Sequence, residues 1–180
     1  MRILEVVDYD PRWPESYENE AETIRGIFGS NIVDIQHIGS TSVPGLKAKP
    51  TIDIMVSVES LLAVDEVNSE MKKAGFEALG EYGIPGRRFF KKVRFVDPEN
   101  WVHSVHVHVF FRDDKENLRR HLAVREFLKA HPGKAEVYGK LKAEVAAKHP
   151  NDNEAYISGK EKFVTELQKE AMEWYSRRPA

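Results

Sequence analysis

Residues 37–58 hold the residue types that bind phosphates and metal ions. They read HIGSTSVPGLKAKPTIDIMVSV, with a glycine and hydroxyl residues near one end and an acid towards the other. Gly39 lets the backbone approach a ligand closely, and Ser40 and Thr41 offer hydroxyls and amides to phosphate oxygens. Asp53 offers a carboxylate, which Mg²⁺ prefers together with substrate phosphates. These residues predict a phosphate-holding turn that faces a metal-binding acid.

Two predicted strands must position this turn. Polar and β-branched residues alternate over residues 32–38, which predicts a half-buried strand that stops at Gly39. A second strand is predicted over residues 51–58. Its period of two places Asp53 on one face and isoleucines and valines on the other. Asp53 is therefore an acid in an apolar strand.

A later predicted strand, residues 101–111, carries three histidines. Alternation places His106 and His108 side by side on one face, with His103 facing away from them. Two imidazoles at this spacing can ligate a metal ion, and a pair of hydrogen-bonded structural histidines is the alternative. The pattern leaves both readings open.

Two arginines, Arg87 and Arg88, end a glycine-containing loop that begins at Gly83. A guanidinium is the side chain best suited to bidentate recognition of phosphate. The alternative is a solvated pair on the surface. Either arginine is a candidate for ligand binding.

The rest of the chain is predicted to be a scaffold of helices and short strands. Apolar residues that recur every three to four positions predict helices over residues 13–28 and 60–74. Further strands are predicted over residues 76–79 and 88–96. From Lys115 onward the pattern predicts three helices, with Asn151 and Glu154 forming the capping box of the last.

Composition limits the classes of partner. A chain of 180 residues with 41% hydrophobic content favours one compact domain. A net charge of −2 disfavours long nucleic acids. With no cysteine the chain has no disulfide or thiolate zinc site, and it is compatible with a reducing cytoplasm, its expected location. No run approaches the roughly 20 apolar residues that span a bilayer, so no membrane partner is expected.

The stretch at residues 37–58 resembles the signature of the GrpB family, whose members read close to HIGSTAVPGLxAKPxIDI. That family in turn resembles the nucleotidyltransferase superfamily of DNA polymerase β. The resemblance extends from the YDPRW run at residues 9–13, through the HVHV run at residues 106–109, to Tyr156, Gly159, Lys160 and Phe163. It implies one GrpB-like domain over residues 1–180 with an α+β fold. Residues 1–112 would form a nucleotidyltransferase-like mixed sheet with flanking helices, and residues 113–180 a C-terminal helical part.

The resemblance also implies roles for individual residues. Asp53 would be catalytic and would bind Mg²⁺ or Mn²⁺, with His106 and His108 as further metal ligands in place of a later carboxylate. A small phosphate-bearing ligand, such as a nucleoside triphosphate, would be held by the residues that could reach its phosphates: Gly39, Ser40, Thr41, Lys49, Arg87, Arg88, Tyr156 and Lys160. Tyr156 and Lys160 lie one helical turn apart, and their spacing matches the family pattern.

One departure from the superfamily pattern bears on activity. That pattern expects two acids flanking one residue, whereas this chain reads Thr51-Ile52-Asp53. A single carboxylate leaves little negative charge to hold two divalent ions close together. Three functions therefore compete: a divergent metal-dependent nucleotidyltransferase acting on a small acceptor, a non-catalytic nucleotide- or phosphate-binding module, and a His/Asp transition-metal site with hydrolase activity.

Overall fold

The computed structural model describes residues 1–178 and shows an α+β fold built on a five-stranded mixed sheet. The strands run in the order β1-β2-β5-β4-β3, with β2 and β5 parallel and the other neighbours antiparallel. Their bounds are β1 (Ile32–Ile38), β2 (Ile52–Val58), β3 (Phe76–Ala78), β4 (Arg88–Phe95) and β5 (Trp101–Phe111). The predicted mixed sheet is confirmed.

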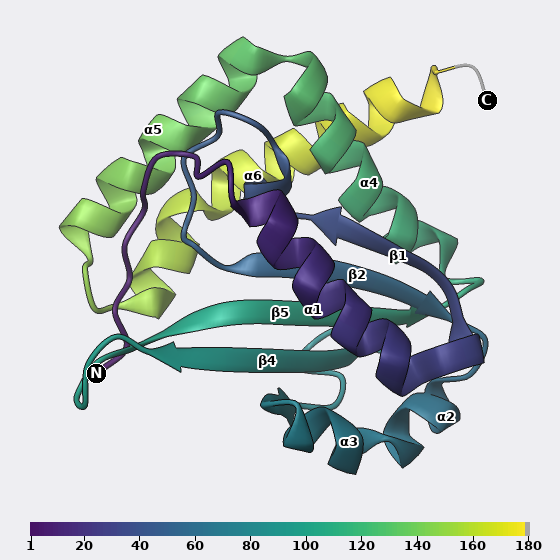
Figure 1. The fold of residues 1–180 in the computed structure, drawn as a ribbon. Coiled ribbons are helices and arrows are strands. Elements are labelled where there is room, and N and C mark those ends of the chain that lie inside the picture. The colour runs from purple at the N-terminus through teal and green to yellow at the C-terminus, as the bar shows by residue number, and fades with distance from the viewer. Residues whose placement is uncertain (179–180) are drawn as a thin grey trace.

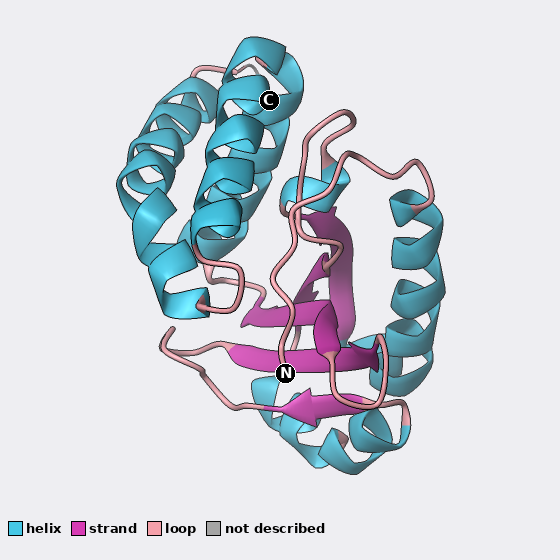
Figure 2. Ribbon diagram, turned by 90° about the vertical axis from the view of Figure 1, so that its left-hand side faces the viewer, coloured by secondary structure: helices cyan, strands magenta, loops and turns pink. Residues whose placement is uncertain are grey.

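Helices cover both faces of the sheet (Figures 1 and 2). One face carries α1 (Trp13–Phe28), α2 (Leu61–Glu66) and α3 (Asn68–Lys73). The other faces a helical layer of α4 (Lys115–Ala130), α5 (Pro132–Lys148) and α6 (Asn153–Ser176). Among residues 1–178, no helix is both long and apolar enough to cross a membrane.

The predicted alternation is confirmed along β2 and along β5 from Val105 onward. The side chains of Ile54 and Val107 are fully buried against α1, in a cluster that includes Ile24. Met55 and Phe110 are buried on the opposite face, where side chains of α4 pack against them. Both strands lie inside the sheet with helices over each face, so a polar residue such as Asp53 is held in a half-buried position.

The predicted helix over residues 60–74 is wrong in one respect, because it is two short helices. Ser60 caps α2 by accepting from the Ala63 amide. At Val67 (φ −101°, ψ 16°) the amide donates to the carbonyl of Val64 three residues back, which tightens the chain and ends α2.

The predicted cap of the last helix is also wrong, by one residue. Asp152, not Asn151, accepts from the Ala155 amide at 3.0 Å. Both residue types cap helices well, but the carboxylate of Asp152 also interacts favourably with the positive end of the helix dipole.

The prediction that His103 faces away from His106 is wrong. In the β4–β5 ladder Lys92 pairs with Val105 and Val93 pairs with His103, so Ser104 is an extra residue in a β-bulge. One extra residue inverts the alternation beyond it. His103 therefore lies against His106, with 2.8 Å between His103 Nδ1 and His106 Nε2.

The turn after β1 is fixed by a glycine that packs on Asp53. Gly39 has φ 71° and is followed by the short 3₁₀ turn η2 (Ser40–Ser42). A Cβ at position 39 would lie 2.6 Å from Asp53 Oδ2. Only glycine combines this backbone conformation with so close an approach to the carboxylate.

Candidate metal and phosphate site

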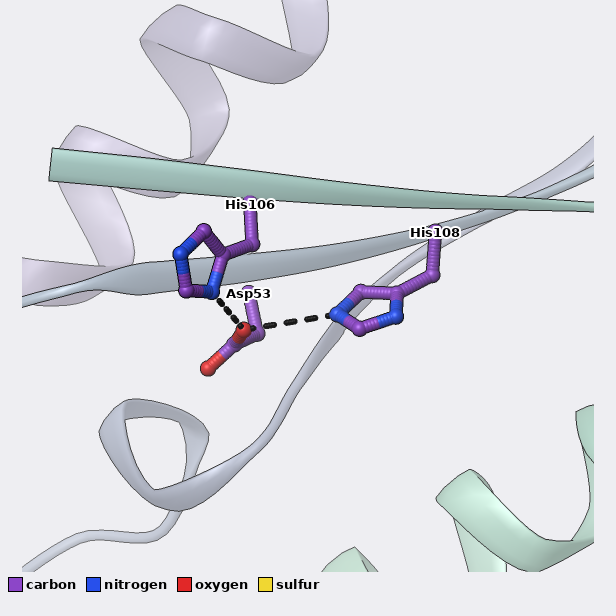
Figure 3. Close-up of side chains that lie close together, drawn as sticks. All are labelled: Asp53, His106 and His108. Carbon is purple, nitrogen blue, oxygen red and sulfur yellow. Dashed lines mark hydrogen bonds and ion pairs between the residues drawn. The ribbon is translucent and has the colours of Figure 1, made fainter. Parts of the chain in front are cut away.

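Asp53 lies between two imidazoles at the centre of the sheet (Figure 3). The parallel register pairs Asp53 with His106 and Met55 with His108. Asp53 Oδ1 is 3.2 Å from His106 Nδ1 and 3.4 Å from His108 Nε2. The structure thus brings together the three residues predicted as metal ligands.

The spacing of the Asp53–His106 pair fits a first-row transition-metal ion. Each of the three side chains offers one ligand atom, and these atoms lie within 4.8 Å of one another. Bonds of about 2.1 Å at tetrahedral angles separate ligand atoms by about 3.4 Å, close to the spacing around Asp53 Oδ1. Imidazoles suit Mn²⁺ or Zn²⁺ better than Mg²⁺, whose sites are built from oxygen.

A hydrogen-bond chain behind His106 fixes which of its ring nitrogens carries the hydrogen. Arg2 Nη2 lies 3.2 Å from His103 Nδ1, and a guanidinium can only donate, so that nitrogen accepts. His106 Nε2, bonded to the same atom, therefore carries a hydrogen. His106 Nδ1 faces the oxygen of Asp53, and a positive group, either a proton or a metal ion, is required between these two acceptors.

The other imidazole, His108, has the opposite arrangement. Arg87 Nη1 lies 3.3 Å from His108 Nδ1, so this nitrogen accepts and Nε2 carries the hydrogen that reaches Asp53. Arg87 is itself buried and donates to the carbonyls of Glu81 and Tyr82. Arg87 therefore reaches the site through His108.

The second arginine, Arg88, lies away from the site. Neighbouring residues of a strand point to opposite faces, and Arg88 forms a bidentate ion pair with Asp65 of α2 at 2.6 and 2.8 Å. Its guanidinium is on the far side of the sheet from Asp53. The predicted contact between Arg88 and a ligand stays a prediction, and the position of the guanidinium on the far side of the sheet does not favour it.

A cavity of about 260 Å³ opens beside Asp53 and His106, between the sheet and the helical layer. Eight of the predicted site residues line it: Gly39, Ser40, Thr41, Lys49, Asp53, His106, Tyr156 and Lys160. Thr41 contributes mainly its backbone, because its hydroxyl contacts His37 and the carbonyl of Thr51. Phosphate-binding and metal-binding candidates therefore share one cavity.

Three lysines give the cavity an excess of basic groups. Burial lowers the pKa of Lys49 to about 8 and that of Lys142 to about 7, and it also lowers the pKa of Lys160. The amines of Lys49 and Lys160 lie 4.9 and 5.2 Å from the ring centroid of Tyr156. Buried amines are costly unless compensated, so the cavity suits an anionic ligand.

Lys142 and Tyr138 line the cavity but were not among the predicted site residues. Their spacing, Tyr-x-x-x-Lys on α5, repeats that of Tyr156 and Lys160 on α6. This repeated spacing is the signal that could have identified them, because residues four apart share one helix face. The side chain of Tyr138 is buried.

Comparison with known proteins now decides the family. A family model described as GrpB protein matches residues 3–170. The chain belongs to the GrpB family. The crystal structure of the conserved protein GrpB from Enterococcus faecalis is similar to this GrpB-family chain, with a TM-score of 0.88 and 38% identity, covering 96% of this chain and 99% of that one.

A sequence relative is longer than this chain. The UPF0157 protein YqkA of Bacillus subtilis (strain 168) is 37% identical over 173 residues, which cover 96% of this chain and 48% of YqkA. The chain thus spans about half the length of YqkA. A structure of Cid1 in complex with its short product ApU aligns at 13% identity and a TM-score of 0.49, over 77% of this chain and 41% of that chain. So distant a likeness carries no weight for the reaction.

Proposed function

We propose that this GrpB-family chain is a divalent-metal-dependent nucleotidyltransferase that transfers a nucleotidyl group from a nucleoside triphosphate to a small acceptor. One observation carries this proposal: the Asp53–His106 pair opens into the same cavity as the Gly39–Ser40 turn and three lysines, of which Lys142 is buried. Metal-assisted phosphoryl transfer needs these two features side by side.

Asp53 and His106 are the residues that would hold a Mn²⁺ ion, and His108 orients the carboxylate through its Nε2–H. When bound, such an ion supplies charge neutralisation at the phosphates and polarises the reacting phosphoryl group. His103 keeps the lone pair of His106 Nδ1 directed at the site by accepting from Nε2.

The phosphate chain is held by groups on the other walls of the cavity. Ser40 offers its hydroxyl from the η2 turn, and Lys49 and Lys160 line the same cavity. These groups bind and orient the triphosphate and neutralise the charge of the departing pyrophosphate. Binding of an anion beside the amines also favours their charged form.

Thr51 limits this chemistry to one metal ion. Its hydroxyl donates to the carbonyl of His103 at 2.9 Å, and its side chain is buried, so it supplies no charge where the superfamily pattern expects an acid. Among the residues that line the cavity, Asp53 therefore supplies the carboxylate for the ion, and the imidazoles of His106 and His108 lie beside it.

The test is a screen of the four ribonucleoside triphosphates for pyrophosphate release with Mn²⁺ and candidate hydroxyl acceptors, including water. We expect release from at least one nucleotide, and Asp53→Asn should reduce it at least 100-fold. Asp34→Asn is the matched control, because Asp34 is exposed on β1. Turnover that persists in Asp53→Asn would refute the assignment.

A second candidate is a non-catalytic nucleotide-binding module, and the observation that favours it is Thr51. In that case nucleotide raises the melting temperature without releasing pyrophosphate. The Asp53→Asn variant separates the two, because only the enzyme has a turnover rate to lose.

A further inference from the structure

The side chains of Ser40 and Lys142 meet across the cavity, although they are 102 residues apart. Lys142 Nζ lies 2.7 Å from Ser40 Oγ, and the side chain of Lys142 crosses from α5 to the η2 turn. Lys142 is only 2% exposed, and its amine lies 4.4 Å from the ring centroid of Tyr138 on the same helix. Packing therefore holds the amine against the serine hydroxyl.

The surroundings of Lys142 favour a neutral amine. Within residues 1–178, no ion pair joins Lys142 to a carboxylate. The ionisable groups that share its cavity are Lys49 from the loop before β2, Asp53 and His106 from the sheet, Tyr138 from its own helix, and Tyr156 and Lys160 from α6. Burial is the largest cause that lowers the pKa of Lys142 to about 7, Lys160 lowers it further, and Asp53 opposes both. A large fraction of the amine can therefore accept a proton at neutral pH.

We propose that Ser40 and Lys142 form a nucleophilic dyad, in which Ser40 accepts the nucleotidyl group before it passes to the acceptor. Serine is a weak nucleophile on its own and is activated by an adjacent base, for which a neutral lysine suffices. Ser40 lines the cavity that the proposed function assigns to the phosphates, so its hydroxyl would be within reach of phosphorus. The nucleotide in this scheme rests on the proposed function, whereas the reactivity of Ser40 does not.

The chemistry balances in two steps. In the first, Lys142 takes the proton of Ser40, Oγ forms a bond to the α-phosphorus, and the bond from that phosphorus to the bridging oxygen breaks to release pyrophosphate. In the second, the acceptor hydroxyl attacks the same phosphorus and loses its proton to water. The bond to Ser40 Oγ then breaks, and the ammonium of Lys142 returns the proton to it.

The first experiment needs neither nucleotide nor metal. Diisopropyl fluorophosphate forms a bond from phosphorus to an activated serine oxygen and releases fluoride. We expect one adduct, mapped to Ser40 by mass spectrometry, with a rate that rises as the pH passes through about 7. Lys142→Met should slow labelling at least tenfold, and its apolar side chain suits the buried position.

Two variants serve as matched controls for this labelling. Lys140→Met removes an exposed lysine of the same helix that pairs with Glu136, and Ser42→Ala removes a hydroxyl of the same turn that donates to the Gly39 carbonyl. Both should label like the wild type. An adduct absent from Ser40, or a rate unchanged by Lys142→Met, would overturn the dyad.

The second experiment links the dyad to the nucleotide. Wild type given Mn²⁺ and the nucleotide that it consumes should carry one nucleotidyl group on Ser40, and Ser40→Ala should lose both this adduct and pyrophosphate release. If Ser40→Ala still releases pyrophosphate, the dyad is refuted while the proposed function stands. If the fluorophosphate labels Ser40 in a Lys142-dependent way but no nucleotide is consumed, the dyad stands and the proposed function fails.

Discussion

Asp53 is a half-buried acid that the site keeps ionised. Burial alone would raise the pKa of its carboxyl, but the close contacts with the imidazoles of His106 and His108 hold that pKa far below its ordinary range. The carboxylate is therefore available to a cation at any pH near neutral. Its two neighbours differ in role, because His106 offers a lone pair and His108 offers an N–H.

This difference gives a test with two alanine variants. His106→Ala removes a ligand and should weaken Mn²⁺ binding more than about 100-fold, whereas His108→Ala removes an orienting group and should weaken it about 10–100-fold. Isothermal titration of Mn²⁺ into each variant measures both, with His149→Gln as control, because His149 caps the end of α5 and does not line the cavity. Unchanged Mn²⁺ affinity in His106→Ala would contradict the assignment.

Gly39 supports the carboxylate by lacking a side chain. In Gly39→Ala the new Cβ would meet Asp53 Oδ2 at 2.6 Å, and the backbone is at φ 71°. We expect a loss of about 1–3 kcal/mol in the free energy of unfolding and a large loss of Mn²⁺ affinity. Gly45→Ala is the matched control, because Gly45 has φ 80° but no atom within 4 Å of its Cβ position. It should lose stability by strain and keep Mn²⁺ affinity, and equal losses of affinity in both variants would argue against the contact with Asp53.

At the scale of elements, the cavity depends on how closely α5 and α6 pack. Each helix contributes one Tyr-x-x-x-Lys pair to its wall. Gly159 of α6 permits the approach, since a Cβ there would lie 2.6 Å from Val145 Cγ1. The position of two lysines thus depends on a glycine that touches no ligand.

Gly159→Ala should therefore destabilise the protein by about 1–3 kcal/mol, although alanine favours a helix by about 1 kcal/mol over glycine. The clash is absent in Val145→Ala. Adding Gly159→Ala to that variant should therefore cost little further free energy of unfolding. Gly133→Ala, on α5 with no atom near its Cβ position, is the control and should not destabilise. Chemical denaturation measures all four, and a Gly159→Ala variant as stable as wild type would contradict the close packing.

The sequence predicts strand faces well because alternation is local. It placed Asp53 and the pair His106 and His108 on polar positions of strands that prove to be parallel neighbours. It misplaced His103, because the bulge at Ser104 is a property of the pairing with β4 and is not visible in one strand. Lys142 was missed for a similar reason, since its partner Ser40 is brought to it only by the packing of the helical layer.

At the scale of the whole molecule, three histidines are folded in their neutral form. Burial lowers the pKa of His37 to about 4 and those of His103 and His121 to about 3. The unfolded chain takes up these protons near pH 6.5, whereas the folded chain does not until the pH falls to about 4 or below. The unfolded state then binds more protons, so stability must fall with pH across this window.

We expect the melting temperature, measured by calorimetry in the presence of a chelator, to fall by roughly 5–10 °C between pH 7 and pH 5. The chelator removes any contribution from metal binding. A melting temperature that stays constant over this range would show that the histidines titrate normally in the folded protein.

The central claim is that Asp53 and His106 hold a metal ion at the phosphates of a nucleotide. Pulsed electron paramagnetic resonance of Mn²⁺ bound to the protein with a non-hydrolysable triphosphate analogue tests it most directly. We expect coupling of the manganese to one imidazole ¹⁴N and to ³¹P, with the nitrogen coupling lost in His106→Ala and kept in His149→Gln. A spectrum with phosphorus coupling but no nitrogen coupling in the wild type would contradict the account.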